Sequence, residues 1–285
     1  MIINMKNIIF MGTPQFSVPI LEKLLKDISA KFHVFSKPDK ARGRGQITSP
    51  SPVKECATNH NLPTYTPTSK EELAGEVTKI DPDLIIVVAY AMILPKSVTD
   101  NYFCINIHAS LLPKYRGASP IHSALLNQDE ETGITLIKMN EKMDEGDVLE
   151  VKNITIEDND NLNTLENKLA LISAKQIVNY LQLNQDLQNA VLAPQNKEKA
   201  SYCYKITKED LSLNLSDTIH TNLGKIKAFA PKPGAKLTKN GKIIKIIDAK
   251  IEDSKLIPLI VKPEGKSEMP YKDYLLGHPE GLTLC

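Results

Sequence analysis

The sequence predicts an α/β fold: a Rossmann-like, mostly parallel sheet, followed by a small β-rich domain. In residues 1–150, short apolar runs alternate with segments of helical periodicity, which is typical of a parallel sheet with helices between its strands. Residues 83–89 are apolar throughout after Asp83, as expected of a strand covered on both faces. Beyond Ser201 the pattern changes to β-like runs that Gly and Pro separate. These three observations carry the prediction.

The elements of the first domain follow from their periodicity. An apolar run over 7–11 predicts a first strand, which ends at the turn Gly12-Thr13-Pro14. A helix is expected next, because apolar residues from Phe16 to Leu25 fall on one stripe. Further strands are expected at 32–35, 83–89, 104–108 and 134–139, before a long helix over 162–181.

Changes in composition set the domain boundaries. A length of 285 residues fits about two domains of roughly 150 residues each. The first domain is expected over 1–181. Residues 182–204 are rich in Gln and Asn and predict an extended linker. Residues 205–285 predict the β-rich domain, with strands such as 242–247 and 256–261.

Charge and composition exclude several classes of protein. The sequence holds 35 Lys and Arg against 34 Asp and Glu, so any nucleic-acid site must be a local patch. It has no run of about 18 apolar residues and no secretion signal, so we expect a cytoplasmic protein that does not enter a membrane. Four scattered Cys and the spacing of the His residues indicate neither a disulfide framework nor a metal site. No glycine-rich dinucleotide or triphosphate motif is present.

The strongest local signal for chemistry is the pair Asn106 and His108. Residues two apart on a strand face the same way, and this strand stops at Pro113, so the pair lies near a carboxyl end, where open α/β sheets bind ligands. Asn donates hydrogen bonds to a developing oxyanion, and His titrates near neutrality. Two satisfied core side chains would show the same spacing.

Acidic residues suited to complete such a site follow a later strand. The sequence predicts a tight turn at residues 144–147 (Asp-Glu-Gly-Asp). A carboxylate is the group that commonly orients an imidazole. A solvent-exposed loop without catalytic function would carry the same acids.

Two stretches are strongly basic. Residues 37–45 carry four positive side chains and one acid, which suits a phosphate backbone and equally a solvated surface loop. Residues 225–245 contain no acid and seven lysines, a density that favours an electrostatic RNA surface: Lys225, Lys227, Lys232, Lys236, Lys239, Lys242 and Lys245.

Longer motifs extend these signals. The run 106–120 (Asn-Ile-His-Ala-Ser-Leu-Leu-Pro-Lys-Tyr-Arg-Gly-Ala-Ser-Pro), with Thr-Gly-Ile-Thr from 132 and Met-Asp-Glu-Gly-Asp over 143–147, resembles the folate-dependent formyltransferases. Gly12-Thr-Pro14, the loop 38–45 and segments 49–54, 204–208 and 233–235 place the resemblance in the branch that formylates methionine on initiator tRNA. It covers nearly the whole chain.

The resemblance implies roles for individual residues. A formyltransferase domain would precede a shortened OB-like barrel that binds tRNA, in a monomeric enzyme. Asn106, His108 and Asp144 match the family's catalytic trio. The folate site would comprise Ser110, Leu111, Leu112, Pro113, Tyr90, Ile93 and Leu94. The tRNA contacts would include Lys40, Arg42, Arg44, Lys225, Lys227 and Lys232.

The implied reaction moves the formyl group of 10-formyltetrahydrofolate to the methionine α-amino group, with no metal. Either Asp144 or His108 would accept the proton of the amine, while Asn106 and His108 stabilise the oxyanion. Two alternatives remain. One is a sugar-nucleotide N-formyltransferase with the same folate donor, which the basic segments disfavour. The other is a noncatalytic folate- or RNA-binding protein, which the presence of all three catalytic residue types disfavours.

Overall fold

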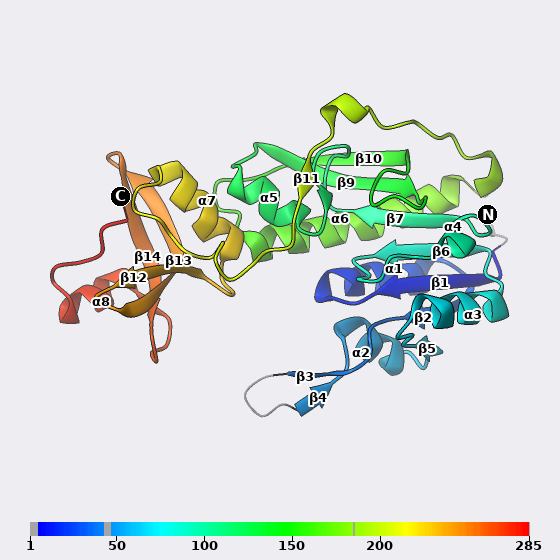
Figure 1. Ribbon diagram of the computed structural model, residues 1–285, viewed down its shortest axis with the longest axis horizontal. Coiled ribbons are helices and arrows are strands. Elements are labelled where there is room, and N and C mark those ends of the chain that lie inside the picture. Colours follow the sequence, from blue (N-terminus) through cyan, green and yellow to red (C-terminus); the bar gives the residue numbers. More distant parts are fainter. Residues whose placement is uncertain (1–4, 43–46, 185, 285) are drawn as a thin grey trace. The chain divides into compact units, whose positions relative to one another are not determined.

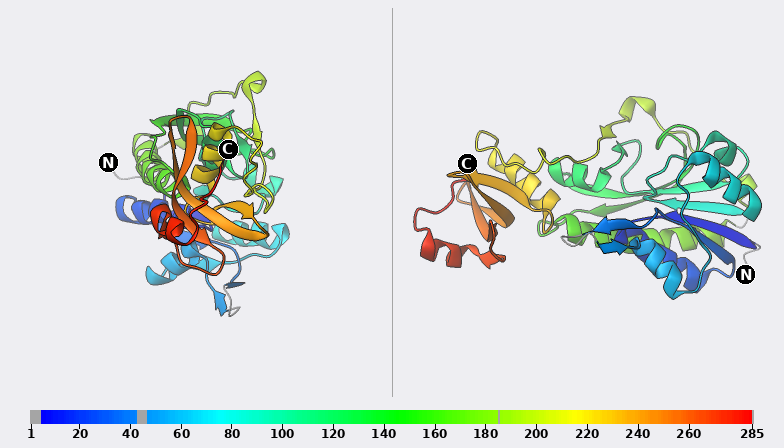
Figure 2. Two further views of the ribbon diagram at one scale, coloured as in Figure 1. Left: turned by 90° about the vertical axis from the view of Figure 1, so that its left-hand side faces the viewer. Right: turned by 60° about the horizontal axis from the view of Figure 1, so that its bottom comes forward.

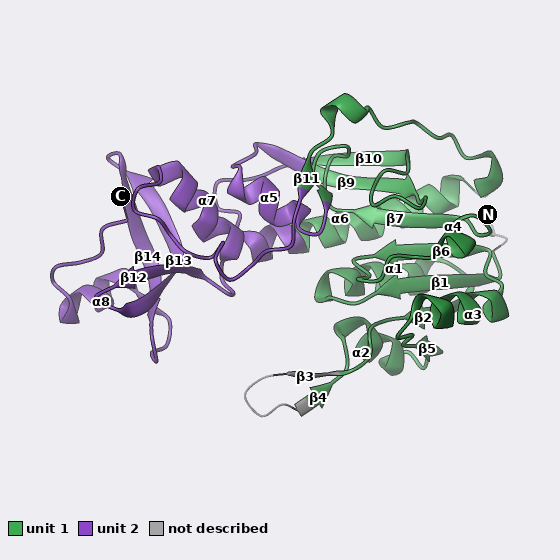
Figure 3. Cartoon of the chain, in the orientation of Figure 1, with its two compact units in different colours: residues 1–116, 133–153, 167–202 green, residues 117–132, 154–166, 203–285 purple. Residues whose placement is uncertain are grey.

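A computed structural model of the chain describes residues 5–42, 47–184 and 186–284 (Figure 1). The chain divides into two compact units, which Figure 3 shows in different colours. The first consists of residues up to 116 together with 133–153 and 167–202, and the second of 117–132, 154–166 and 203 onwards. Each unit therefore joins segments that are distant in the sequence.

The larger sheet has seven strands in the order β10-β9-β7-β6-β1-β2-β5. The pairs formed by β7, β6, β1, β2 and β5 are parallel, whereas β9 runs antiparallel to β7. The sheet is therefore mostly parallel, which confirms the predicted fold class. The strand bounds are Asn7–Gly12 (β1), Lys31–Phe35 (β2), Thr64–Tyr65 (β5), Leu84–Val88 (β6), Cys104–His108 (β7), Glu131–Lys138 (β9) and Asp147–Thr155 (β10).

Helices connect these strands, and the longest of them, α6, runs alongside the sheet (Figures 1 and 2). Pro residues at the first turn of α1 and α2 fit there because a helix start needs no amide donor. The helix bounds are Val18–Asp27 (α1), Pro52–Asn59 (α2), Lys70–Ile80 (α3), Lys96–Thr99 (α4) and Leu162–Leu183 (α6). A short hairpin of β3 (Lys40–Arg42) and β4 (Ile47–Ser49) precedes α2.

The strand order of the sheet reverses direction at β1. From β1 the chain proceeds to β2 on one side, whereas β6 pairs with β1 on its other side and leads on to β7. The carboxyl ends of β1, β6 and β7 lie at the same edge because these strands are parallel. Ligands of open α/β sheets bind at such a point of reversal. The candidate site residues that follow β6 and β7 are thus brought to this edge.

The second unit contains a smaller antiparallel sheet in the order β12-β13-β14-β15. This confirms the predicted β-rich C-terminal domain. Helix α7 packs on α5, and the close approach requires Gly224, because a Cβ there would lie 2.9 Å from the backbone oxygen of Leu126. The bounds are Pro120–Leu126 (α5), Ile219–Phe229 (α7), Ala235–Lys239 (β12), Lys242–Glu252 (β13), Lys255–Pro263 (β14), Met269–Pro270 (β15) and Tyr271–Gly277 (α8).

The segment predicted as a linker belongs to the first unit as far as Tyr202. We call residues 190–202 the strap. Its Ala193 pairs with Val148 at the start of β10 through two backbone hydrogen bonds of 2.8 and 2.9 Å. Its end enters β11 (Tyr202–Cys203), which pairs with β8 (Arg116–Gly117). The strap is thereby hydrogen-bonded to β10 at Val148 and to β8 at Arg116.

Within the described ranges, the helices are all too short or too polar to cross a bilayer.

Candidate active site

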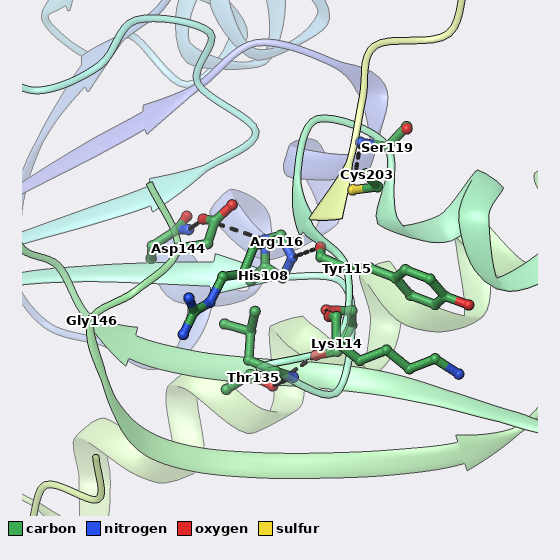
Figure 4. A network of polar contacts seen from close by, with 12 residues as sticks. His108, Lys114, Tyr115, Arg116, Ser119, Thr135, Asp144, Gly146 and Cys203 are labelled. Atoms are coloured by element: carbon green, nitrogen blue, oxygen red, sulfur yellow. Dashed lines mark hydrogen bonds and ion pairs between the residues drawn. The ribbon is translucent and has the colours of Figure 1, made fainter. Parts of the chain in front are cut away.

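The three residues predicted as a catalytic trio lie together, and Figure 4 shows His108 and Asp144 side by side. Asn106 and His108 stand on β7, and Asp144 stands on the turn between β9 and β10. Asn106 Nδ2 donates a hydrogen bond of 3.1 Å to Asp144 Oδ1, and His108 Nδ1 lies 3.5 Å from the same oxygen. The side chains of His108 and Asp144 are 6% and 11% exposed. One carboxylate oxygen therefore orients both partners in a partly desolvated position.

The second ring nitrogen of His108 fixes its orientation. Nε2 lies 2.9 Å from the backbone oxygen of Tyr115. A carbonyl oxygen only accepts, so Nε2 carries a proton and Nδ1 is the nitrogen that faces Asp144. Tyr115 itself has a left-handed backbone with φ of 60°, which is strained for a bulky residue and persists only where neighbours hold it.

The turn that carries Asp144 is equally constrained. Asp144 adopts a left-handed φ of 54°. Gly146 is required two residues later, because a Cβ there would collide with the backbone oxygen of Lys138. The side-chain amide of Gln195 donates two hydrogen bonds to this turn, of 2.8 Å to Asp144 O and 2.7 Å to Gly146 O. The position of the carboxylate thus depends on a residue of the strap.

The loop over 110–113 is fixed by Thr135 on β9. The Thr135 hydroxyl donates to Ser110 O at 2.7 Å and accepts from Leu112 N at 3.1 Å. Ser110 Oγ in turn donates to Lys114 O at 2.5 Å. Thr135 is fully buried. It belongs to a segment that the sequence motifs include, but nothing in those motifs signals its bonds to this loop.

Apolar residues predicted for the folate site differ in exposure. Tyr90, Leu94 and Leu112 are buried, whereas Ile93 is 55% exposed. Tyr90 and Leu94 belong to a buried hydrophobic cluster with Val98 and Cys104. Burial raises the pKa of Tyr90 to about 12, with a smaller contribution from Glu72, so its hydroxyl stays neutral at physiological pH. Leu111 and Pro113 are half-buried.

The predicted tRNA contacts fall into three groups. Arg44 lies outside the described residues, and Lys40 and Arg42 are the first and last residues of β3. Lys225 Nζ forms an ion pair of 2.9 Å with Asp217. Lys227 is half-buried and Lys232 is exposed. All of these residues lie apart from the trio in the sequence.

A row of lysines crosses the smaller sheet. Lys236 on β12 pairs with Lys245 on β13, which pairs with Lys262 on β14. Residues paired directly across antiparallel strands point to the same face. Two of these lysines lie within the basic stretch of the sequence, whereas Lys262 lies outside it and is brought to the row by strand pairing. We call these three residues the lysine row.

Sequence reasoning missed Arg116 and Gln195. Arg116 is 3% exposed, and its Nε and Nη2 donate to Gln195 Oε1 at 3.1 and 2.8 Å. Its Nη1 lies 3.5 Å from Glu145 Oε1 and 3.4 Å from the Tyr202 hydroxyl. Figure 4 shows the Arg116 side chain directed toward the turn at Gly146. Apart from the position of Arg116 in the quoted motif, no local pattern marks these residues.

No group of three metal-ligating side chains occurs among residues 5–42, 47–184 and 186–284.

Comparisons with known proteins identify the family that this chain resembles. Residues 5–181 match the family described as formyl transferase, and residues 205–257 match the formyl transferase C-terminal domain. The chain is 36% identical over 300 residues to a methionyl-tRNA formyltransferase of Ehrlichia ruminantium (strain Gardel), which covers 95% of this chain and 97% of that protein. It is 40% identical over 252 residues to the methionyl-tRNA formyltransferase of Bacillus subtilis (strain 168), covering 85% and 77%.

A solved structure supports the fold. HypX from Aquifex aeolicus, in complex with tetrahydrofolic acid, matches with a TM-score of 0.66 over 95% of this chain and 47% of that one. The two sequences are 15% identical over the match, so this likeness concerns the fold alone.

Proposed function

The chain belongs to the formyl transferase family, and on this basis we propose that it transfers the formyl group of 10-formyltetrahydrofolate to the α-amino group of methionine on initiator tRNA. The product is N-formylmethionyl-tRNA, which serves in translation initiation. The observation that carries the proposal is the meeting of Asn106, His108 and Asp144 at the carboxyl edge of the sheet. An amide donor, an imidazole and a carboxylate are the groups that formyl transfer to an amine needs.

The residues at this edge suit a folate. Buried Tyr90, Leu94 and Leu112 supply an apolar surface for a flat ring system, and the polar trio lies beyond it on the neighbouring strand end. The Ser110–Leu112 backbone, held by Thr135, presents a fixed loop beside His108. Apolar walls with a few convergent polar groups are typical of sites for small organic ligands. We assign the folate to these residues, together with Leu111, Pro113 and Ile93.

The reaction forms one bond to the formyl carbon, from the amine nitrogen, and breaks one, to the folate nitrogen. When bound, the folate supplies a formyl carbon that takes up the lone pair of the methionine amine, as its bond to the folate nitrogen breaks. The chain must then move one proton from the amine to that nitrogen and stabilise negative charge on the formyl oxygen. Only the neutral amine has a lone pair, and a free α-amino group titrates near pH ~8.

Each residue of the trio has a part in that task. Asn106 has a second amide N–H besides the one bound to Asp144, and we assign that donor to the formyl oxygen. The proton of the amine passes to His108 Nδ1, either directly or by way of Asp144 Oδ1, and His108 then delivers that proton from Nδ1 to the departing nitrogen. His108 Nε2 stays bound to Tyr115 O, which keeps Nδ1 on the reacting side.

The tRNA is assigned to basic residues of both domains. We propose that a catalytic domain over 1–181 is joined by residues 182–204 to a tRNA-binding domain over 205–285. The lysine row offers three positive side chains on one face of the smaller sheet, of which Lys262 also forms an ion pair of 3.3 Å with Glu268. Like charges placed opposite each other destabilise a sheet, and a phosphate backbone would offset that repulsion. Lys40, Arg42, Arg44, Lys225, Lys227 and Lys232 are the further candidates.

The test is transfer of labelled formyl from 10-formyltetrahydrofolate to methionine-charged initiator tRNA. His108→Ala is assayed beside the unaltered protein, and a panel of amino-sugar nucleotides replaces the tRNA in parallel reactions. Formylated tRNA that is lost in His108→Ala supports the proposal. Turnover on a sugar nucleotide alone would support the catalytic role of the trio and overturn the proposed tRNA substrate. A protein that transfers formyl to no amine would overturn the proposed enzymatic activity.

A further inference from the structure

We propose that Gln195 is a positioning residue of the active site, whose side-chain amide holds the Asp144–Gly146 turn so that the Asp144 carboxylate meets Asn106 and His108. This inference rests on the proposed function, because it concerns the geometry of the same trio. Gln195 lies in the strap, 51 positions beyond Asp144 in the sequence. The amino-acid composition around Gln195 suggests a linker, but its side chain contacts the turn that carries Asp144.

The donor side of the Gln195 amide secures the turn at two points. Nε2 donates to Asp144 O at 2.8 Å and to Gly146 O at 2.7 Å, which uses both of its hydrogens. The two accepting carbonyls belong to the 144–145 and 146–147 peptide groups, so both ends of the Glu145–Gly146 segment are fixed. Asp144 is left-handed, and a strained backbone persists only where its surroundings determine it. The bonds from Gln195 help to hold Asp144 in this conformation.

The acceptor side fixes which way the amide points. Oε1 accepts from Arg116 Nε at 3.1 Å and from Nη2 at 2.8 Å. A guanidinium only donates, so the amide oxygen must face Arg116 and the NH₂ group must face the turn. Arg116 is nearly fully buried and also lies 3.5 Å from Glu145 Oε1, within the same turn. The rigid fork of Arg116 therefore orients Gln195, and Gln195 orients the Asp144 backbone.

The backbone of the strap brings Gln195 to this position. Ala193 and Val148 exchange two hydrogen bonds, two residues before Gln195 and two residues after Gly146. This pairing sets the register between strap and turn. Gln195 itself is only half-buried, so its truncation creates no large cavity in the core. A kinetic effect that exceeds its effect on stability is accordingly expected.

The test compares two changes at Gln195 with a matched change nearby. Gln195→Met keeps the length and removes all four bonds, and Gln195→Glu keeps the acceptor for Arg116 but loses the donors to the turn. Gln188→Met alters an exposed Gln of the preceding segment and serves as control. Both Gln195 variants should lose kcat for formyl transfer on the order of 10²-fold, as small displacements of catalytic groups do, with KM for both substrates nearly unchanged. Gln188→Met should match the unaltered protein.

A double-mutant cycle separates positioning from general destabilisation. In an Asp144→Asn background the carboxylate is absent, so Gln195→Met should cost no more than about twofold in kcat. An equal loss in both backgrounds, or a Gln195→Glu variant as active as the unaltered protein, would overturn the inference.

A readout independent of activity distinguishes this inference from the proposed function. Amide hydrogen exchange of the peptide over 140–148 should be faster in Gln195→Met than in the unaltered protein and in Gln188→Met. Unchanged exchange would sink the role of Gln195 whatever the activity. Faster exchange in a protein that transfers no formyl group would support the clamp and refute the proposed function alone.

Discussion

Asn106 donates its side-chain amide to Asp144 Oδ1 at 3.1 Å across 38 positions of the chain. Asn106 is held rigidly by strand β7, whereas Asp144 stands on a left-handed turn. His108 Nδ1 lies 3.5 Å from the same carboxylate oxygen, so a displaced turn would disorient both partners at once. The rigidity of the turn is therefore as important to the proposed chemistry as the identity of the three residues.

Replacing Asn106 by Ala tests its assignment as the donor to the formyl oxygen. We expect kcat to fall by about 10²–10³-fold, the usual loss for one oxyanion donor, with little change in KM. Single-turnover formyl transfer measures this directly. Asn101→Ala, which removes an exposed amide bound to Ser97 O, is the control and should stay fully active. An Asn106→Ala variant with normal single-turnover rates would remove Asn106 from the reaction.

The trio could be predicted because its signals are local. Asn106 and His108 lie two apart on an apolar strand, so alternation alone places them on one side, and the motif supplies Asp144. The strap could not be predicted as part of the site. Gln195 contacts residues 49 to 79 positions away, and the Gln- and Asn-rich sequence around it is what a solvated linker also has.

Charge patterns show a similar limit. Lys225 lies in an acid-free stretch, yet it pairs with Asp217, which lies eight positions before it. Lys262 lies outside the stretch, yet strand register aligns it with Lys236 and Lys245. The pairing register of antiparallel strands depends on turns and on burial of one face, so a run of lysines does not reveal which of them share a surface.

Gly146→Ala should damage the turn through sterics. The added Cβ would meet the backbone oxygen of Lys138, which cannot move aside as a side chain can. We expect kcat to fall by about 10²-fold or more as Asp144 is displaced. Gly75→Ala is the matched control, because helix α3 leaves open space around its Cβ and the change should stabilise the protein by about 0.5–1 kcal/mol. Thermal unfolding and steady-state kinetics check both variants, and a fully active Gly146→Ala would contradict the account of the turn.

Ser201→Ala should act through Tyr115, which binds His108 at the ring nitrogen that faces away from Asp144. Ser201 Oγ accepts from Tyr115 N at 2.9 Å, and Tyr115 O is the acceptor for His108 Nε2. Loss of the hydroxyl removes a bond that holds the left-handed Tyr115, which should cost about 1–3 kcal/mol in stability and lower kcat. Ser201→Thr keeps a hydroxyl and should recover most of the activity. Equal activity of Ser201→Ala and Ser201→Thr, measured with saturating substrates, would show that Tyr115 is held without this bond.

The lysine row predicts opposite effects on binding and stability. Lys245→Ala removes the middle of three like charges, so the free energy of unfolding should rise or stay constant. Affinity for tRNA should fall, and the slope of log affinity against log salt should decrease by about 1. Lys79→Ala changes the net charge equally at a lysine already paired with Glu76, and should leave the slope unchanged. A salt titration in which both variants retain the original slope would rule out the row as a phosphate contact.

His122 should make the stability of the second unit depend on pH. It lies on α5 with its ring 6.1 Å from that of Phe229, and burial lowers its pKa from the usual value of 6.5. Below pH ~6.5 the unfolded chain therefore binds a proton that the folded chain does not, and the free energy of unfolding falls as pH falls through that range. Above it the contribution is fully present.

The measurement that isolates this effect is urea unfolding of the unaltered protein and of His122→Phe at pH 7.5 and 5.5. His122→Phe keeps an aromatic ring and cannot titrate, so it should lose less stability between the two pH values than the unaltered protein does. Some dependence should remain, because burial and Lys31 also lower the pKa of His33. Identical losses in the two proteins would mean that His122 is charged in the folded state, since only an unshifted group leaves the linkage unchanged.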